Sequence, residues 1–317
     1  MLFALSSSVE IGALLSVWTS KLYYRMSSSC RPCAALCQLN VTADKQANLC
    51  AAQGLLEEAK QRGACMAFLP EAFDYIGSSR EETLALSETL AGHTMMRYTQ
   101  MARKLDIWLS LGGFHERGSD WEAEQRIYNC HVVINNHGEI VSTYRKCHLF
   151  DVELPEKGVS LNESTFTVPG PSLVAPVQTP IGKLGLGVCY DLRFPEFSLA
   201  LQKSGAEILT FPSAFTVTTG AAHWEVLLRA RAIENQCYVL AAAQVGRHHD
   251  RRSSYGHSLA VDPWGTVAAD CGGERAGVAL VEVDLAQIRS LRRNMPLHEH
   301  RRDAAFYASL EGGRRVK

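Results

Sequence analysis

Residues 185–196 have the sequence Gly-Leu-Gly-Val-Cys-Tyr-Asp-Leu-Arg-Phe-Pro-Glu. The apolar run from Leu184 to Val188 predicts a buried strand, and Pro195-Glu196 predicts the start of a helix that continues over 197–204. The glycines in the strand indicate that other backbone approaches it closely. Cys189 stands at the end of this strand, where α/β proteins expose side chains to a cleft. The polar Tyr-Asp-Leu-Arg sequence after it favours a reactive thiol over an inert buried one.

The segments on both sides of this unit alternate between apolar strands, helices and hairpins. This pattern is typical of an α/β protein with mixed sheets and excludes all-helical and all-β folds. We expect one domain over 33–305, an N-terminal extension over 1–32 and a basic C-terminal tail over 306–317. The expected strands are 34–39, 64–69, 107–111 (ended by Gly112-Gly113), 206–211 and 237–244, the helices 45–62, 83–105 and 222–235, and the hairpins 128–144 and 258–269.

The composition limits the kinds of partner and cofactor. The chain has 317 residues, 46% of them apolar, and a formal net charge of −1. This balance argues against nucleic-acid binding, which needs clustered Lys and Arg. Ten cysteines in a chain of this length do not form a disulfide scaffold and indicate a reducing compartment. Neither Cys30-x2-Cys33-x3-Cys37 nor His248-His249-Asp250 has the pattern of a metal site, so we expect no metal.

The first 26 residues have features of a targeting segment. The apolar run 11–17 is too short to span a bilayer, and its basic residues, Lys21 and Arg25, follow it rather than precede it as they do in a secretory signal. The segment is Ser-rich with a single acid, Glu10, as in a mitochondrial presequence. A start at Met26 would omit it. We therefore expect cytoplasmic and mitochondrial forms and no membrane association.

Two more charged residues directly follow predicted strands. Glu71 comes after Pro70, between apolar neighbours, where partial desolvation would raise its pKa toward that of a general base. Lys146 ends the return strand of the hairpin 128–144, where an ammonium could lower a thiol pKa and stabilise an oxyanion. Taken alone, each is more often a solvated surface charge. His148, close by, is more often a packing residue than a base.

Together the three segments carry a resemblance. Leu-Pro-Glu71, Tyr-Arg-Lys146 and Val-Cys189-Tyr-Asp-x-Arg-Phe-Pro-Glu, in this order, resemble the nitrilase (carbon–nitrogen hydrolase) superfamily over residues 34–305. The resemblance implies a four-layer αββα sandwich, a homo-oligomer (dimer or tetramer) and a Glu-Lys-Cys triad without metal or organic cofactor. Some family members add a second glutamate between the lysine and the cysteine. Glu163 matches that position best, with Glu153 and Glu156 as alternatives.

Finer features resemble one branch of the superfamily, the amidases of deaminated glutathione. They lie in segments 112–117, 127–131, 246–250 and 254–258. This resemblance implies hydrolysis of deaminated glutathione to 2-oxoglutarate and cysteinylglycine. The ω-amidases, which act on 2-oxoglutaramate, share the triad but match less well around 246–258, and they are the first alternative. A non-catalytic interaction protein on the same scaffold is the second.

Residues that bind the substrate must meet the charges of such an amide. The Tyr190 N–H, directly after the thiol, is a candidate donor to the oxyanion. A substrate that carries carboxylates needs cations or hydrogen-bond donors, for which Arg193, Ser213 and Thr216 are the candidates. Arg193 could equally brace Glu196 or Asp191.

Overall fold

The computed structural model describes residues 31–308 except 158, and the described residues from Pro32 to Ala308 form one compact unit. The candidate targeting segment, the second start at Met26 and Cys30 lie outside the described residues, as does most of the predicted tail. No helix in the described part of the chain has both the length and the apolar character needed to cross a membrane.

Two six-stranded sheets form the centre of this unit. The first has the order β16-β1-β2-β3-β4-β5, in which β1, β2 and β3 are parallel and the other strands pair antiparallel. Its register places Leu36 opposite Phe68, and Phe68 opposite Ser110. The strands are β16 (Gly277–Glu282), β1 (Cys33–Gln38), β2 (Met66–Leu69), β3 (Trp108–Glu116), β4 (Tyr128–Ile134) and β5 (Ile140–Arg145).

The second sheet has a similar plan. Its order is β15-β14-β11-β10-β9-β8, with β9, β10 and β11 parallel and the outer strands antiparallel. The strands are β15 (Val267–Asp270), β14 (Leu259–Val261), β11 (Tyr238–Ala241), β10 (Ile208–Thr210), β9 (Gly182–Leu186) and β8 (Val177–Thr179).

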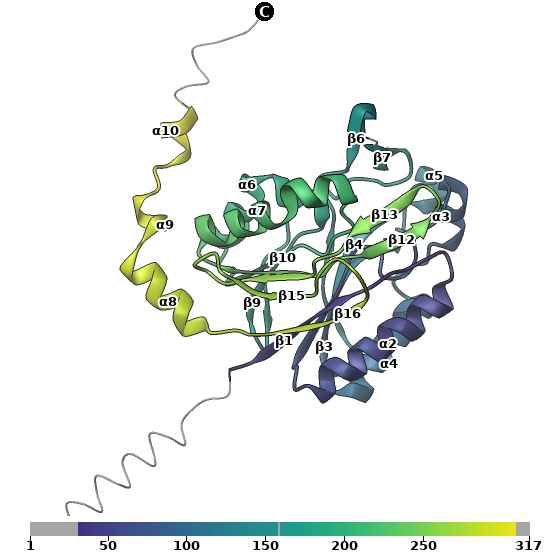
Figure 1. Ribbon diagram of the computed structural model, residues 1–317. Helices are drawn as coiled ribbons and strands as arrows, with labels where there is room; N and C mark the ends of the chain where they lie inside the picture. Colours follow the sequence, from purple (N-terminus) through teal and green to yellow (C-terminus); the bar gives the residue numbers. More distant parts are fainter. Residues whose placement is uncertain (1–30, 158, 309–317) are drawn as a thin grey trace, which may run out of the picture. The chain divides into compact units, whose positions relative to one another are not determined.

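Helices cover the outer face of each sheet (Figure 1). Helices α2 (Lys45–Gln61) and α4 (His93–Leu105) pack on the first sheet, and α6 (Pro195–Lys203) and α7 (Val217–Asn235) pack on the second. One apolar cluster lies under α2 and α4. A larger one fills the space between the sheets and under α6 and α7. The predicted αββα sandwich is therefore confirmed.

The structure corrects two predicted elements. The helix expected over 83–105 is two helices, α3 (Arg80–Leu86) and α4, because the segment between them runs beside the end of β3, where Glu88 forms a β-bridge with Glu116. The Glu88 carboxylate then accepts a hydrogen bond from Thr94 N at the start of α4. Strand β3 also continues through Gly112-Gly113 instead of ending there. Its register with β4 shifts between Leu111 and Phe114, which marks a β-bulge.

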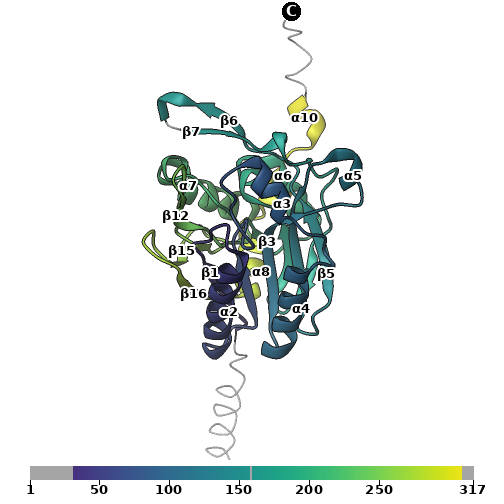
Figure 2. The same ribbon diagram turned by 90° about the vertical axis from the view of Figure 1, so that its right-hand side faces the viewer.

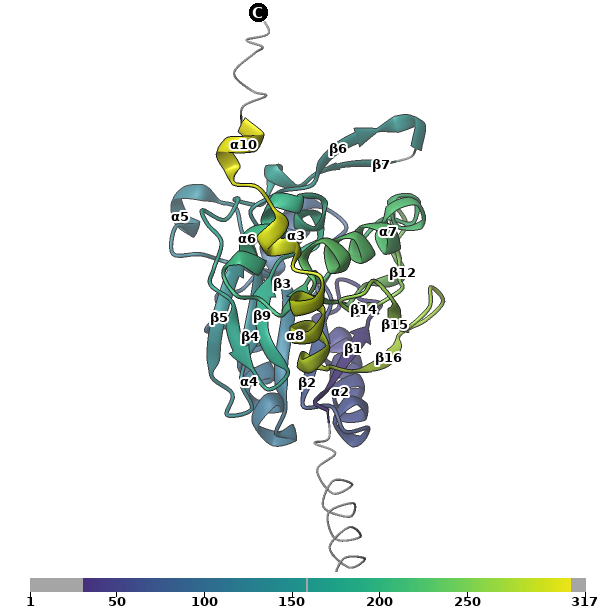
Figure 3. The same cartoon turned by 90° about the vertical axis from the view of Figure 1, so that its left-hand side faces the viewer.

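Several shorter elements have no counterpart in the sequence prediction. Two hairpins, β6–β7 and β12–β13, lie at the same end of the unit, and β6–β7 projects beyond the sheets (Figures 2 and 3). Their strands are β6 (Asp151–Leu154), β7 (Val159–Asn162), β12 (Val245–His249) and β13 (Arg252–Tyr255). The remaining helices are α5 (Trp121–Glu124), α8 (Leu285–Asn294), α9 (Leu297–His300) and α10 (Ala304–Ala308).

The two sheets are joined at the end where the parallel strands finish. Leu39, after β1, forms a β-bridge with Gln244, after β11, and Gln244 Nε2 donates 3.0 Å to Glu71 O. Ser213, after β10, bridges to Ala243. Because the carboxyl ends of parallel strands from both sheets meet here, residues far apart in sequence converge at this edge.

Candidate active site

Glu71 lies directly after β2 and is 6% exposed. Its Oε1 accepts hydrogen bonds from Lys146 Nζ at 3.0 Å and from Asn129 Nδ2 at 2.9 Å. Its Oε2 accepts one from the Ala214 backbone N–H at 3.0 Å. Both carboxylate oxygens are thus held by donors from three other segments of the chain, so the orientation of the carboxylate is fixed.

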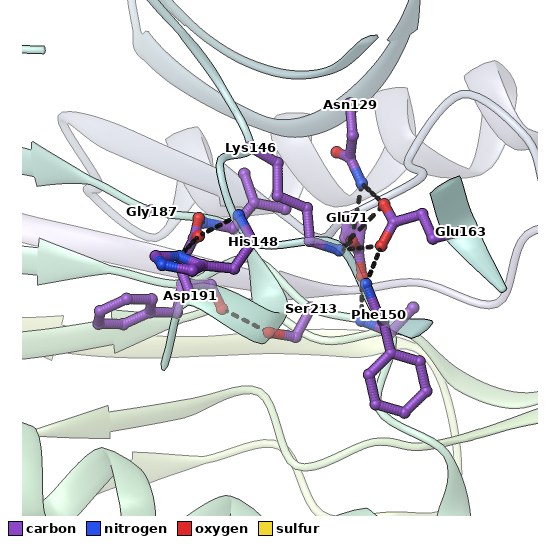
Figure 4. A network of polar contacts seen from close by, with 12 residues as sticks. Glu71, Asn129, Lys146, His148, Phe150, Glu163, Gly187, Asp191 and Ser213 are labelled. Carbon is purple, nitrogen blue, oxygen red and sulfur yellow. Dashed lines mark hydrogen bonds and ion pairs between the residues drawn. The ribbon is translucent and has the colours of Figure 1, made fainter. Parts of the chain in front are cut away.

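Lys146 follows β5 directly and is 2% exposed. Figure 4 shows its ammonium between the carboxylates of Glu71 and Glu163. The Nζ atom donates to Glu163 Oε2 at 2.8 Å and to Oε1 at 3.1 Å. Asn129 Nδ2 bridges the two carboxylates, since it also lies 3.1 Å from Glu163 Oε1. A buried ammonium with two carboxylates and an amide donor forms a closed polar network.

The structure brings Glu163, and not its two alternatives, to this network. Glu163 begins the 3-10 turn after β7, is 5% exposed and accepts a hydrogen bond from Phe150 N at 2.7 Å. Glu153 lies exposed on β6, where it accepts from Ser160 Oγ, and Glu156 lies exposed in the turn between β6 and β7. The second glutamate implied by the family resemblance is therefore matched by Glu163.

Cys189 sits at a sharp turn after β9 with φ of +45°, a left-handed conformation that is uncommon for a residue with a side chain. Its N–H donates to Pro212 O at 3.0 Å. The buried Asp191 holds the turn, because its Oδ2 accepts from Val188 N at 2.9 Å and from Tyr144 OH at 2.8 Å. Hydrogen bonds to Pro212 O and to the Asp191 carboxylate thus hold the left-handed conformation at the nucleophile.

His148 supports this turn and does not face the thiol as a base would. Its Nδ1 lies 2.7 Å from Asp191 Oδ1, and its ring stacks on Phe194 with centroids 3.7 Å apart.

The expectation that the glycines let other backbone approach β9 also needs correction. A Cβ on Gly187 would meet the rings of Phe211 at 2.7 Å and Phe197 at 3.0 Å, so side chains fill that space.

The ionisation of the three central groups follows from burial and mutual contact. Burial and the neighbouring Glu71 carboxylate raise the pKa of the Cys189 thiol, although Lys146 and the Ala214 N–H act against them. Burial lowers the pKa of Lys146, but Glu163 and Glu71 outweigh it and raise that pKa well above its ordinary value. The resting groups are a neutral thiol and an ammonium.

The pKa of Glu71 moves opposite to the sequence prediction. Burial does raise it, as expected, but the Lys146 ammonium and hydrogen bonds from Cys189 and Asn129 hold it below the ordinary value. A buried ion pair accounts for the difference, because the opposite charge favours the ionised form more than desolvation disfavours it. An ionised carboxylate therefore lies beside a protonated thiol, the arrangement from which a base can take the thiol proton.

A pocket with an empty volume of about 810 Å³, open solvent at its mouth included, lies over these groups. Tyr190, Arg193 and Thr216, which the sequence predicted as substrate-binding residues, line it. Ser213 does not. Ser213 is fully buried and its hydroxyl donates to Phe211 O at 2.9 Å, so we withdraw it as a substrate-binding residue.

Arg193 faces the pocket and does not brace either acid considered from the sequence. Its guanidinium lies over the rings of Tyr190 at 5.6 Å and Phe215 at 5.2 Å. Its NH1 lies 3.2 Å from His223 Nδ1. Thr216 has a structural task as well, since its hydroxyl caps the start of α7 by accepting from Thr219 N.

Sequence reasoning missed several residues of the site. Asn129 is a polar residue near the start of a mostly apolar strand, and that contrast was the signal available for it. The Ala214 N–H left no signal, because any residue can supply a backbone donor. Arg252, from the β12–β13 hairpin, also lines the pocket.

Gly113 gives a test of how tightly Glu71 is positioned. Its φ is +65°, and a Cβ there would lie 2.7 Å from Glu71 Cγ and 2.9 Å from Ala72 N. We expect Gly113→Ala to lower kcat by about 100-fold, because the added Cβ would displace the Glu71 carboxylate. The variant should also lower the free energy of unfolding by about 1 to 2 kcal/mol, because alanine is strained at this positive φ. Steady-state kinetics and denaturant unfolding measure the two effects.

Gly54 is the matched control for that variant. It lies inside α2, and a Cβ there meets nothing within 4 Å. Gly54→Ala should leave kcat unchanged and raise stability by about 0.5 to 1 kcal/mol, since alanine favours the helix. Wild-type kinetics in Gly113→Ala would mean that the carboxylate tolerates displacement.

The buried thiol, the carboxylate base beside it and the ammonium, at the floor of a pocket in an αββα sandwich, define a hydrolase that works through a thiol nucleophile. Residues 33–293 match the carbon–nitrogen hydrolase family. The chain therefore belongs to the carbon–nitrogen hydrolase family, and it is an amide-cleaving enzyme of that family.

Relatives of this chain support the same assignment. It is 61% identical over 277 residues to human "Deaminated glutathione amidase", which covers 87% of this chain and 84% of the relative. The crystal structure of the Caenorhabditis elegans NitFhit protein matches with a TM-score of 0.80 and 48% identity over 86% of this chain, which spans 65% of that fusion protein. Saccharomyces cerevisiae Nit3 matches with a TM-score of 0.75 and 30% identity, over 87% of this chain and 98% of that one.

Proposed function

We propose that this chain hydrolyses the amide bond of deaminated glutathione and releases 2-oxoglutarate and cysteinylglycine. The observation that carries the proposal is the 61% identity to the human amidase of that name. The geometry adds support, because the network of Glu71, Lys146, Glu163 and Cys189 lies at the floor of a pocket that also holds arginines for an anionic substrate.

In the first half of the reaction, Glu71 takes the Cys189 proton as the thiolate attacks the amide carbonyl. The Lys146 ammonium and the Tyr190 N–H stabilise the oxyanion that forms on the carbonyl oxygen. The carbon–nitrogen bond then breaks, and Glu71 gives its proton to the leaving amine of cysteinylglycine. The 2-oxoglutaryl group remains on Cys189 as a thioester.

In the second half, Glu71 removes a proton from water as the water oxygen attacks the thioester. The carbon–sulfur bond breaks, 2-oxoglutarate leaves, and the proton returns to the Cys189 sulfur. Glu71 thus serves as base twice and as acid twice. Glu163 and Asn129 keep Lys146 and Glu71 in place through both halves, which rests on the contacts of 2.8 to 3.1 Å between them.

Substrate choice tests the proposal. We expect kcat/KM for deaminated glutathione to exceed that for 2-oxoglutaramate by at least about tenfold, since a missing charge-assisted contact costs at least that much. Release of 2-oxoglutarate from each substrate gives the measurement, and Cys189→Ala gives the background. A preference for 2-oxoglutaramate would assign an ω-amidase activity instead. No turnover of either would favour the non-catalytic alternative.

We also propose that the chain acts as a homo-oligomer, a dimer or a tetramer. Helix α7 exposes Val226 (69%) and Ile233 (43%), which lie seven residues apart and therefore on the same face of the helix, and a second copy that packs on this face would bury them. The molar mass in solution, measured by light scattering, tests this. A monomer mass at micromolar concentration would contradict it.

A further inference from the structure

Arg252 is a cation of the pocket that the catalytic network does not use. It lies on β13, is half-buried and lines the pocket together with Cys189. Within residues 31–157 and 159–308, its guanidinium has no hydrogen-bond acceptor and no acidic partner. The other arginines of the same hairpin are satisfied, Arg247 by Asp250 at 2.6 Å and Arg251 by Ser78 O at 2.7 Å. A half-buried guanidinium without an acceptor is suited to an anionic ligand.

The β12–β13 hairpin is fixed in the molecule, so Arg252 has a defined place. Val245 N donates to Leu39 O at 2.8 Å. The buried His248 donates from Nδ1 to Val41 O and pairs through Nε2 with Ser254 Oγ, both at 2.8 Å. Ser254 forms a β-bridge with Thr216. Contacts to both sheets therefore anchor the strand that presents Arg252.

Arg252 and Arg193 reach the pocket from different elements of the chain. Arg193 lies in the same short helical turn as Cys189 and contacts Tyr190 and Phe215. Arg252 comes from the β12–β13 hairpin, whose Arg251 donates to Ser78 O, and Ser78 is next to the pocket residue Gly77. His115 also lines the pocket but is already paired with Asp74 at 2.9 Å.

The chemistry of the substrate calls for two cations. Deaminated glutathione carries one carboxylate on its acyl group and another at the glycine end of its leaving group. The glycine carboxylate lies two residues beyond the scissile nitrogen, up to about 7 Å away in an extended chain. Lys146 pairs with Glu71 and Glu163, and its remaining N–H serves the oxyanion in the proposed mechanism, so other cations must meet the two substrate carboxylates.

We propose that Arg252 binds the terminal carboxylate of the leaving group and so selects amides whose leaving group is an anionic peptide. This rests on the proposed function and adds the part of the pocket that reads the leaving group.

The experiment pairs variants with substrates that differ only on the leaving-group side. The substrates are deaminated glutathione, its C-terminal carboxamide and 2-oxoglutaramate. The variants are Arg252→Gln, Arg252→Lys and, as the matched control, Arg247→Gln on the same hairpin, which is exposed and does not line the pocket. We would measure kcat/KM for each variant with each substrate, and thermal unfolding would verify that each variant is folded.

We expect wild type to lose about 10- to 100-fold in kcat/KM on the carboxamide. Arg252→Gln should lose the same factor on deaminated glutathione and stay within about twofold of wild type on the carboxamide and on 2-oxoglutaramate. Arg252→Lys should recover part of the loss, and Arg247→Gln should match wild type throughout.

Two results overturn the assignment of Arg252 while the proposed function stands. One is equal loss in Arg252→Gln on all three substrates, which would place Arg252 on the acyl side or in the scaffold. The other is a wild type that cleaves the carboxamide as well as the acid. Absence of turnover of deaminated glutathione by wild type is a different result, and it overturns the proposed function together with this inference.

Discussion

Glu71→Gln is expected to reduce kcat by about 100- to 10,000-fold, because glutamine cannot take the thiol proton, protonate the leaving amine or activate water. The variant keeps the shape of the side chain and an oxygen that can accept from the Ala214 N–H, which lies 3.0 Å from Oε2 in the wild type. The loss should therefore come from proton transfer and not from a collapse of the site. Steady-state kinetics with deaminated glutathione measures it.

Alkylation of Cys189 separates the base from the nucleophile. In wild type the Glu71 charge contributes to the raised pKa of the thiol, while Lys146 opposes it. Glutamine removes that charge and leaves Lys146, so the thiolate becomes easier to form once the base is gone. We therefore expect alkylation by iodoacetamide to be retained or faster in Glu71→Gln while hydrolysis falls. Peptide mapping, with Cys189→Ala as the control, shows that the label is on Cys189 and not on another cysteine. Equal losses of alkylation and hydrolysis in Glu71→Gln would mean that Glu71 only ionises the thiol.

The pH profile of wild type follows from the same pKa directions. Activity needs Glu71 ionised, and its pKa is held below the ordinary value, so kcat/KM should stay level through neutral pH and fall only in acid below the usual glutamate range. Because the pKa values of Cys189 and Lys146 are raised, neither group should change its protonation between pH 6 and 8, and the profile of kcat/KM should show no limb there. A profile with an acid limb near pH 6 to 7 would contradict the ion-pair account of Glu71.

The three segments of the triad could be recognised in the sequence because Glu71, Lys146 and Cys189 each follow a predicted strand closely. Taken alone, Glu71 and Lys146 were expected to be surface charges, and the family resemblance assigned the triad. What the sequence could not supply was the sign of the Glu71 pKa shift. That sign depends on Asn129 and Lys146, 58 and 75 residues away, whose distances to the carboxylate only the fold determines.

The missed elements are those whose stability comes from outside their own sequence. The β12–β13 hairpin has a polar sequence, His248-His249-Asp250-Arg251-Arg252, without alternation, and it is held by Leu39 and Thr216. Gly112-Gly113 looked like a strand end because glycine usually weakens strands. In the fold it makes a bulge that passes Pro212, and a Cβ on Gly112 would lie 2.0 Å from Pro212 Cβ.

Lys146→Met should lower both turnover and stability, because it removes the cation from between two buried carboxylates. Glu71 and Glu163 would then share only Asn129 and their backbone donors. Breaking a buried pair in this way costs about 3 to 5 kcal/mol, and loss of the oxyanion partner should reduce kcat by about 100- to 1,000-fold. Denaturant unfolding and kinetics measure the two effects. Lys60→Met is the control, since Lys60 pairs with Asp106 at the surface and should cost at most about 1 kcal/mol.

A second substitution distinguishes the structural part of that loss from the catalytic part. Glu163→Gln in the Lys146→Met background removes one of the two uncompensated carboxylates, so most of the lost stability should return. Turnover should not return, because the donor to the oxyanion is still missing. If the double variant recovers turnover together with stability, Lys146 serves only to neutralise the buried carboxylates, and the oxyanion must be held by backbone donors such as the Tyr190 N–H.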